Sequence, residues 1–241
     1  MCVIFIAYKI LAEYPLILLA NRDEYYDRPA LPLGWWDDDP DIYAGKDLVA
    51  GGTWLGVTRG GRFAAVTNYR DPSAPIGKRS RGELVSNYLR SNGTVHDYLE
   101  GVQASQGEFS PFNLLVGAIG EGCADLAYFS NRADKIRRLT PGIYGLSNHL
   151  LDTPWPKVRD GKAKLKSLLS SASTDDESLF DLLASNTTAN DNELPATGIS
   201  LERERALSSI FIVTPDYGTR CSTIFRFDCE GNWQMTERTH V

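Results

Sequence analysis

The chain has 241 residues, with 42% hydrophobic and 23% charged side chains, which is the composition of an ordinary globular protein with a sizeable core. Its net charge of −6 argues against a nucleic-acid-binding protein, because such proteins normally present a basic face. The four cysteines have neither zinc-site nor haem-attachment spacing, so we predict no metal site and expect a reducing compartment.

The amino-terminal apolar stretch, residues 2–20, is interrupted too often to cross a membrane. It contains Lys9, Glu13 and Pro15, whereas a bilayer-spanning helix needs about 20 predominantly apolar residues in a row. It also lacks the basic region and the small-residue cleavage site of a signal peptide. We therefore expect a cytoplasmic protein without a membrane span.

The same stretch is predicted to form two strands. Residues 2–8 and 16–20 are unbroken apolar runs, which are typical of strands covered on both faces, and Pro15 supplies turn chemistry between them. The second run leads directly into Asn21-Arg22-Asp23-Glu24. Four polar side chains are therefore expected at the end of a buried strand, where a sheet can present chemistry.

The rest of the chain alternates between groups of strands and pairs of helices. The Gly60-Gly61 pair predicts a tight hairpin, and Ser80 and Thr94 are predicted helix caps. The predicted elements are strands at 53–58, 62–69, 112–118, 124–129, 143–147, 209–214, 219–227 and 232–237, and helices after Ser80, after Thr94, and at 155–169 and 178–183. This order favours an α+β fold, and no stretch resembles a linker, so we predict a single domain over residues 1–241.

Two charged runs have more than one interpretation. Lys78-Arg79-Ser80-Arg81 is interpreted as a solvated loop that enters a helix, and a grip on an anionic ligand is the alternative. The acidic run 37–41 resembles the start of a calcium loop, but Ile42 and Leu48 stand where such a loop needs Gly and Glu. Together with Trp35-Trp36 it is interpreted as a packed loop, with the lip of a pocket as the alternative.

Cys2 is the first candidate for chemistry. Removal of Met1 would give one residue both a thiol and a free α-amine, and this amine titrates near ~7.7–8.0, where it can accept the thiol proton. N-terminal-nucleophile hydrolases use this arrangement. The alternative is an inert cysteine buried at the start of a strand.

Three polar segments bear on that choice. Arg22, in the polar run after the second strand, could lower the pKa of a nearby thiol. The alternative is a salt bridge of Arg22 with Asp23, Glu24 or Asp27 that holds a turn. Asn68 and Asn148 each lie at the end of a predicted strand, and asparagine amides or backbone N–H groups can stabilise an oxyanion. Taken singly, each asparagine also suits a turn.

Taken together, these segments closely resemble the NRDE family, also called the transport and Golgi organisation protein 2 family. The resemblance covers nearly the whole chain. It is carried, in order, by "MCVIF", "LLANRDEYYDRP", "GGTWLGVTRGGRFAAVTNYRDP", "SRGELV", "PFNLLVG", "TPGIYGLSNHLLDTPWPKV", "YGTRCSTI" and "TER".

The family in turn is similar to the cysteine N-terminal-nucleophile hydrolases of the bile-salt hydrolase and penicillin V acylase type. This resemblance implies an αββα four-layer sandwich with two antiparallel sheets between helix layers. It matches Cys2 to the nucleophile, Asn68 to a backbone oxyanion donor, Asn148 to a side-chain donor and, more loosely, Arg220 to a distal arginine. The acylases usually have Arg-Asn-x-Asp after the second strand, so the shifted Arg22-Asp23 pair departs from their pattern, and its roles do not carry over directly.

The resemblance implies a hydrolase that needs no cofactor and cleaves the C–N amide bond of a small acylated amine. Cys2 would be the nucleophile, with Arg22 and Asp23 positioning and activating it. The alternative is a non-catalytic protein that carries haem, or handles acyl-CoA or lipid, in the same pocket, with Cys2 or His149 as the candidate haem ligand. In both cases the expected partner is a small molecule.

Overall fold

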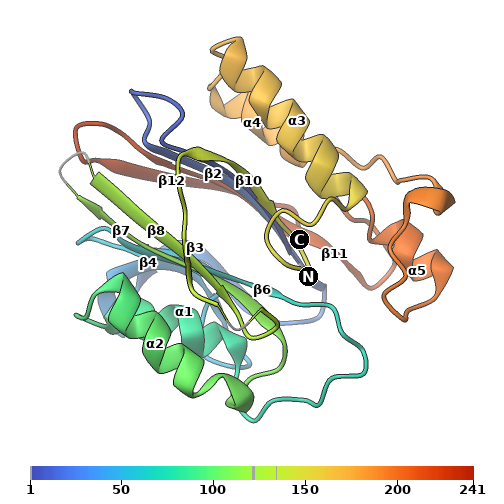
Figure 1. Cartoon of the computed structure of the whole chain (residues 1–241), viewed down its shortest axis with the longest axis horizontal. Coiled ribbons are helices and arrows are strands. Elements are labelled where there is room, and N and C mark those ends of the chain that lie inside the picture. The colour runs from blue at the N-terminus through green and yellow to red at the C-terminus, as the bar shows by residue number, and fades with distance from the viewer. Residues whose placement is uncertain (1, 121–122, 134) are drawn as a thin grey trace.

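Two antiparallel β-sheets lie face to face between two layers of helices in the computed structural model, which describes residues 2–120, 123–133 and 135–241 (Figure 1). Helices α1 and α2 cover one sheet, and α3 and α4 cover the other. The predicted αββα four-layer sandwich is therefore confirmed.

The first sheet contains the amino-terminal strands and the closing strands of the chain. Its order is β10-β1-β2-β11-β12. Both central apolar runs are buried along their length, because helices cover one face and the second sheet covers the other. The strands are β1 (Cys2–Tyr8), β2 (Leu16–Tyr25), β10 (Gly142–Leu146), β11 (Tyr217–Phe227) and β12 (Trp233–Thr239).

The second sheet has the order β3-β4-β5-β6-β7-β8-β9. Its β5–β6 hairpin turns at Gly61, where φ is +78° and an added Cβ would lie 2.1 Å from the Ile119 carbonyl oxygen, so the turn requires glycine. The strands are β3 (Ala30–Trp36), β4 (Asp39–Asp47), β5 (Leu55–Thr58), β6 (Arg62–Asn68), β7 (Phe112–Gly120), β8 (Cys123–Ser130) and β9 (Arg137–Arg138).

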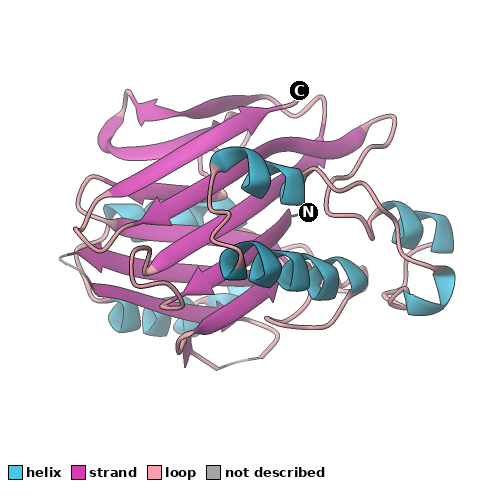
Figure 2. Ribbon diagram, turned by 90° about the horizontal axis from the view of Figure 1, so that it is seen from above, coloured by secondary structure: helices cyan, strands magenta, loops and turns pink. Residues whose placement is uncertain are grey.

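The first two helices begin at the predicted caps. Ser80 caps α1 (Arg81–Arg90) and Thr94 caps α2 (Val95–Ala104), each through a reciprocal capping box. Pro156 opens α3 (Pro156–Ser170), whose partner in the same layer is α4 (Asp176–Leu183). The shorter pieces are the 3-10 helices Gln106–Glu108 and Asp191–Glu193 and the helix α5 (Leu201–Ala206). Helix α5 lies beyond the N-terminal end of α3 (Figure 1), and Figure 2 shows the four layers from above.

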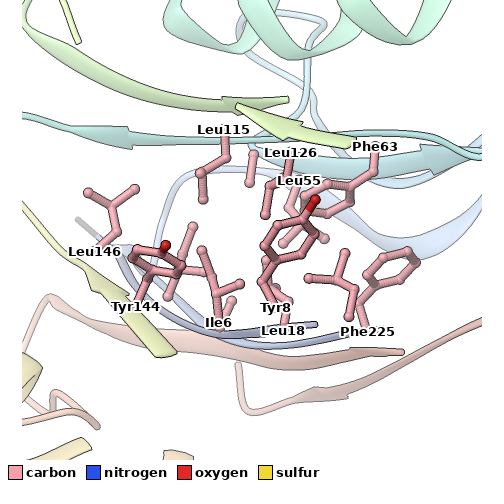
Figure 3. Packing of buried hydrophobic residues seen from close by; sticks show 14 of the residues in the cluster. Ile6, Tyr8, Leu18, Leu55, Phe63, Leu115, Leu126, Tyr144, Leu146 and Phe225 are labelled. Atoms are coloured by element: carbon pink, nitrogen blue, oxygen red, sulfur yellow. The ribbon is translucent and has the colours of Figure 1, made fainter. Parts of the chain in front are cut away.

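Buried side chains fill the three interfaces between the four layers. Between the two sheets, Ile6, Leu18 and Phe225 of the first sheet face Phe63 and Leu115 of the second (Figure 3). The Phe63 and Phe225 rings stack with centroids 5.0 Å apart. This apolar interface fixes how the two sheets lie against each other at the end where their polar residues gather.

Two of the predictions for local structure are wrong. Residues 209–214 do not form a strand, because their backbone groups bond instead to scattered partners, such as the Ser185 carbonyl that accepts from Phe211 N. The segment around Trp35-Trp36 and the acidic run is not a loop but the hairpin of β3 and β4 at the sheet edge, whose exposed faces weaken the hydrophobic pattern. Of the helices in the described ranges, none has both the length and the low polarity needed to cross a bilayer.

Candidate active site

The start of β1, the end of β2 and the middle of β11 meet in a cleft of about 750 Å³. In the strand register, Arg22 lies between Cys2 on β1 and Cys221 on β11, so these three side chains share one face of the sheet. All three line the cleft, together with Asp23, Asn68 and Arg220. The structure thus brings five of the six predicted site residues to one cavity wall.

Cys2 lies at the inner end of this cleft and is only 7% exposed. Its carbonyl oxygen accepts a hydrogen bond of 3.1 Å from Ser147 Oγ, which fixes the backbone at the start of β1. Burial raises the pKa of the Cys2 thiol, and the negative charge of Asp23 raises it further, whereas Arg22 acts in the opposite direction. The thiol therefore needs a nearby base before it can react as a thiolate.

The polar run of β2 is divided between the two faces of the sheet, because successive side chains of a strand alternate. Arg22 faces the cleft, where its Nη2 lies 3.8 Å from Asp47 Oδ2. Asn21 points the other way and donates through Nδ2 to the carbonyl oxygens of Leu183 and Ile210, each at 2.9 Å. Asn21 therefore anchors the helix layer to β2. The carboxylate beside Arg22 is that of Asp47, rather than Asp23, Glu24 or Asp27 as in the alternative interpretation.

Asp23 is the most deeply buried carboxylate near Cys2, with 1% exposure. Its Oδ1 accepts a hydrogen bond of 2.8 Å from Thr219 Oγ1, and its backbone carbonyl accepts one of 2.9 Å from the Tyr217 hydroxyl. Burial raises the pKa of the Asp23 carboxyl, while the Lys157 charge and the Thr219 hydrogen bond act to lower it. The position of Asp23 is thus fixed by β11.

Lys157 is a residue that our sequence reasoning missed. It is 3% exposed at the start of α3, and its Nζ makes no hydrogen bond within the described ranges. Burial lowers the pKa of Lys157 to about 8, against the attraction of Asp23. Two features of the sequence could have indicated it. Lys157 is a cation in the first turn of a helix, where the helix dipole disfavours positive charge, and it lies between the apolar residues Pro156 and Val158.

The two predicted asparagines are joined to each other. Asn148 Nδ2 donates to the Asn68 carbonyl oxygen at 3.0 Å, and Ser147 Oγ lies 3.2 Å from Asn148 Oδ1 while it donates to Cys2. Asn68 lines the cleft, whereas Asn148 is fully buried behind it. Their roles as oxyanion donors stay predictions.

Arg220 is the extra residue of a β-bulge, because Thr219 pairs with Asp23 and Cys221 pairs with Arg22. Its guanidinium Nη1 donates to the carbonyl oxygens of Tyr25 and Arg28. Arg220 therefore holds the turn after β2 against the cleft wall.

The candidate haem ligands do not share the cleft. Both ring nitrogens of His149 lie 2.8 Å from hydroxyl oxygens, Nε2 from Tyr69 and Nδ1 from Thr153, and the histidine is not among the cleft residues. Cys2 does line the cleft, but its raised thiol pKa opposes the thiolate form that ligates iron. Of the two candidates, Cys2 alone therefore lines the cleft, and the described residues contain no cluster of three or more His, Cys, Asp or Glu side chains arranged for a metal ion.

Two solved structures with a similar fold are described as hydrolytic enzymes. A Caenorhabditis elegans N-acylethanolamine-hydrolyzing acid amidase ortholog matches with a TM-score of 0.51 over 92% of both chains, at 12% identity. A conjugated bile acid hydrolase from Clostridium perfringens matches with a TM-score of 0.50 over 99% of this chain and 92% of that one, at 8% identity. At such low identity these matches show a shared fold alone, in which two antiparallel sheets lie between helix layers.

Sequence relatives identify the family. The Transport and Golgi organization protein 2 homologs of Bos taurus and Homo sapiens are each 34% identical to this chain, over 99% of its length and 93% of theirs. The Drosophila melanogaster Transport and Golgi organization protein 2 is 27% identical over 99% of this chain and 92% of its own. The family model described as Transport and Golgi organisation 2 matches residues 1–241, and the chain therefore belongs to this family.

Proposed function

We propose that this protein hydrolyses the C–N amide bond of a small acylated amine, with Cys2 as the nucleophile. The observation that carries the proposal is the convergence of Cys2, Arg22, Asp23 and Asn68 on one cleft at the start of β1. The names of the two structural neighbours support the class of reaction, since one acts on N-acylethanolamines and the other on conjugated bile acids.

The reaction begins with proton transfer. Removal of Met1, a residue outside the described ranges, frees the α-amine of Cys2, whose ordinary pKa of about 7.7–8.0 suits a base at neutral pH. The amine takes the thiol proton, and the sulfur attacks the amide carbonyl carbon. Collapse of the tetrahedral intermediate breaks the C–N bond, and the leaving amine receives the proton. Water then hydrolyses the thioester, which releases the carboxylic acid and restores the thiol.

The backbone N–H of Asn68, which lines the cleft, is the proposed donor to the oxyanion. Asn148 is fully buried, and one N–H of its amide binds the Asn68 carbonyl, so it holds Asn68 in position. Arg22 opposes the effect of burial on the Cys2 pKa and so favours the attacking thiolate.

The first test compares Cys2 variants on a panel of N-acyl amines. Intact mass measurement first establishes that the purified protein has lost Met1, a change of about 131 Da. We expect Cys2→Ala to lower the hydrolysis rate at least about 10³-fold, because the bond-forming atom is gone. The matched control is Cys221→Ala, which removes the other thiol beside Arg22 and should keep the rate within several-fold.

The outcome also separates the hydrolase from a carrier. Turnover that survives Cys2→Ala, or turnover by protein that keeps Met1, would contradict the mechanism. Tight retention of acyl lipid or haem by Met1-free protein, without cleavage of any amide in the panel, would replace it with the carrier alternative.

A further inference from the structure

The cleft is basic although the whole chain is acidic. Its described lining contains more cationic than anionic side chains, in a protein whose net charge is −6. The cations are Arg22, Arg28, Lys46, Lys78, Arg79, Arg81 and Arg220, and the anions are Asp23, Glu24, Asp47 and Glu237. A cleft with this imbalance attracts anionic ligands.

Several of these cations are already held by carboxylates of the same chain. Arg28 Nε lies 2.6 Å from Asp47 Oδ2, which also faces Arg22 at 3.8 Å. Lys46 pairs with Asp38 at 2.6 Å. Arg79 likewise bridges Glu83 and Glu108, at 3.0 Å each. Such cations contribute less to the binding of a ligand, because their donors are occupied.

Arg81 is different. It is the first residue of α1, and its Nη1 donates to the Pro111 carbonyl oxygen at 3.2 Å. No carboxylate lies within ion-pair distance of it in the part of the chain that the structure describes. A guanidinium has five N–H donors, so Arg81 has further donors, and its positive charge, with which to bind a ligand in the cleft.

The position of Arg81 is fixed relative to Cys2. Ser80, whose side chain accepts from Gly82 N, caps α1 and sets its first turn against the cleft. Burial lowers the pKa of the Arg81 guanidinium, and a negative charge on Cys2 opposes that shift, so the two groups lie within each other's electrostatic reach. An anion bound to Arg81 therefore occupies the same cleft as the Cys2 thiol.

The cleft also has an apolar side. Leu31 is 51% exposed and Ile76 is 94% exposed, and both line the cleft with Pro32 and Trp54. Exposed apolar side chains around a concave surface suit an acyl chain. A ligand that satisfies both sides has an apolar acyl group and a charged group beyond the amide.

We infer that the substrate is an N-acyl amine whose amine portion bears a carboxylate, sulfonate or phosphate, and that Arg81 binds this anionic group. The inference rests on the proposed function for the presence of the amide. The anionic group itself is argued from the cleft alone.

The preference for an anionic substrate can be tested without turnover by measuring the binding of N-acyl amines to the inactive Cys2→Ala protein. The probes are N-dodecanoylglycine and N-dodecanoyltaurine, which are anionic, and the neutral N-dodecanoylethanolamine, all measured by calorimetry. We expect both anionic probes to bind at least about tenfold more tightly than the neutral one. In the same background Arg81→Met should remove that preference, while Arg81→Lys should retain part of it.

The matched control is Arg90→Met, at the other end of α1. Its Nε lies 2.8 Å from Asp39 Oδ2 and the residue is not part of the cleft, so it should leave the preference unchanged. Equal affinity for the anionic and neutral probes would overturn the inference, and that comparison needs no Arg81 variant to fold. An Arg81→Met protein that keeps the preference would also overturn it.

The inference and the proposed function can fail separately. Selective, Arg81-dependent binding of the anionic probes by a protein that hydrolyses none of them would support the inference and contradict the hydrolase. Hydrolysis of N-dodecanoylethanolamine at the same kcat/KM as N-dodecanoylglycine would support the hydrolase and contradict the inference of an anionic substrate.

Discussion

The Asn-Arg-Asp-Glu run shows what strand alternation does to four consecutive polar residues. The sequence predicted that they end a buried strand, and β2 in fact continues through them to Tyr25. Arg22 therefore faces the cleft and Asn21 the helix layer. The period of a strand could have predicted this division, but not the partners of Asn21, because Leu183 and Ile210 are 162 and 189 residues away in the chain.

At the same scale, Lys157 makes the free energy of unfolding depend on pH in the alkaline range. Its pKa falls from the ordinary 10.5 to about 8 in the folded protein, so between these values the unfolded chain holds a proton that the folded chain has released. The free energy of unfolding therefore rises with pH in this window. Relative to Lys157→Met, the wild type should gain roughly 2 kcal/mol between pH 7.5 and 9.5.

Urea denaturation of both proteins at the two pH values measures that difference, and other groups that titrate in the window largely cancel. Lys166→Met, on the exposed side of the same helix, controls for the loss of a lysine charge. An unchanged difference between wild type and Lys157→Met would mean that Lys157 keeps its proton in the folded protein.

At the scale of elements, α3 is fixed to β1 by the close approach of a glycine. An added Cβ at Gly161 would lie 2.1 Å from Phe5 Cζ, and Phe5 is fully buried beneath the helix. A glycine within a helix costs about 0.5–1 kcal/mol relative to alanine, so it is retained here for packing. Because Phe5 follows Cys2 on β1, the same contact supports the start of the candidate site.

We therefore expect Gly161→Ala to lower the free energy of unfolding by about 1–2 kcal/mol, since the cost of overpacking exceeds the gain in helix propensity. The matched control is Gly101→Ala on α2, where nothing lies within 4 Å of an added Cβ and a gain of about 0.5–1 kcal/mol is expected. Denaturant melts of the two variants check the opposite signs. If both substitutions stabilise the protein, the Phe5 ring can move aside to make room for the added methyl group.

The predictability of the elements followed the strength of their local signals. The central strands and α1 to α4 were predicted because apolar periodicity and caps mark them. Helix α5 was missed because its six residues, Leu201–Ala206, are mostly charged, and its main anchor is the buried ion pair of Glu204 with Arg70, at 2.5 Å. An anchor of this kind depends on a residue 134 positions earlier in the chain, which no local pattern reveals.

At the scale of the whole molecule, the candidate site exists only because two sheets and two helix layers meet. Cys2 and Arg220 come from the first sheet, Asn68 from the second, and Arg81 from the helix that covers it. The resemblance to N-terminal-nucleophile hydrolases predicted the first three, since each belongs to a motif. Lys157 and the charge imbalance of the cleft emerge only from burial and from ion pairs, which the fold determines.

The stacked Phe63 and Phe225 rings should therefore couple the stability of the two sheets (Figure 3). Phe225→Ala should cost about 3–5 kcal/mol, because both rings are fully buried and a cavity would form between the sheets. The double-mutant cycle with Phe63→Ala should give a coupling of about 0.5–1.5 kcal/mol.

Denaturation followed by far-UV circular dichroism and by tryptophan fluorescence checks this, and it also tests the prediction of a single domain over residues 1–241. One shared core predicts that both signals move together in a single transition and that Phe225→Ala shifts them equally. Met235 of β12 and Leu126 of β8 lie in the same buried cluster, so the disturbance should spread through strands of both sheets. Two separated transitions, with only one displaced by Phe225→Ala, would instead mean that each sheet and its helix layer unfold as independent units.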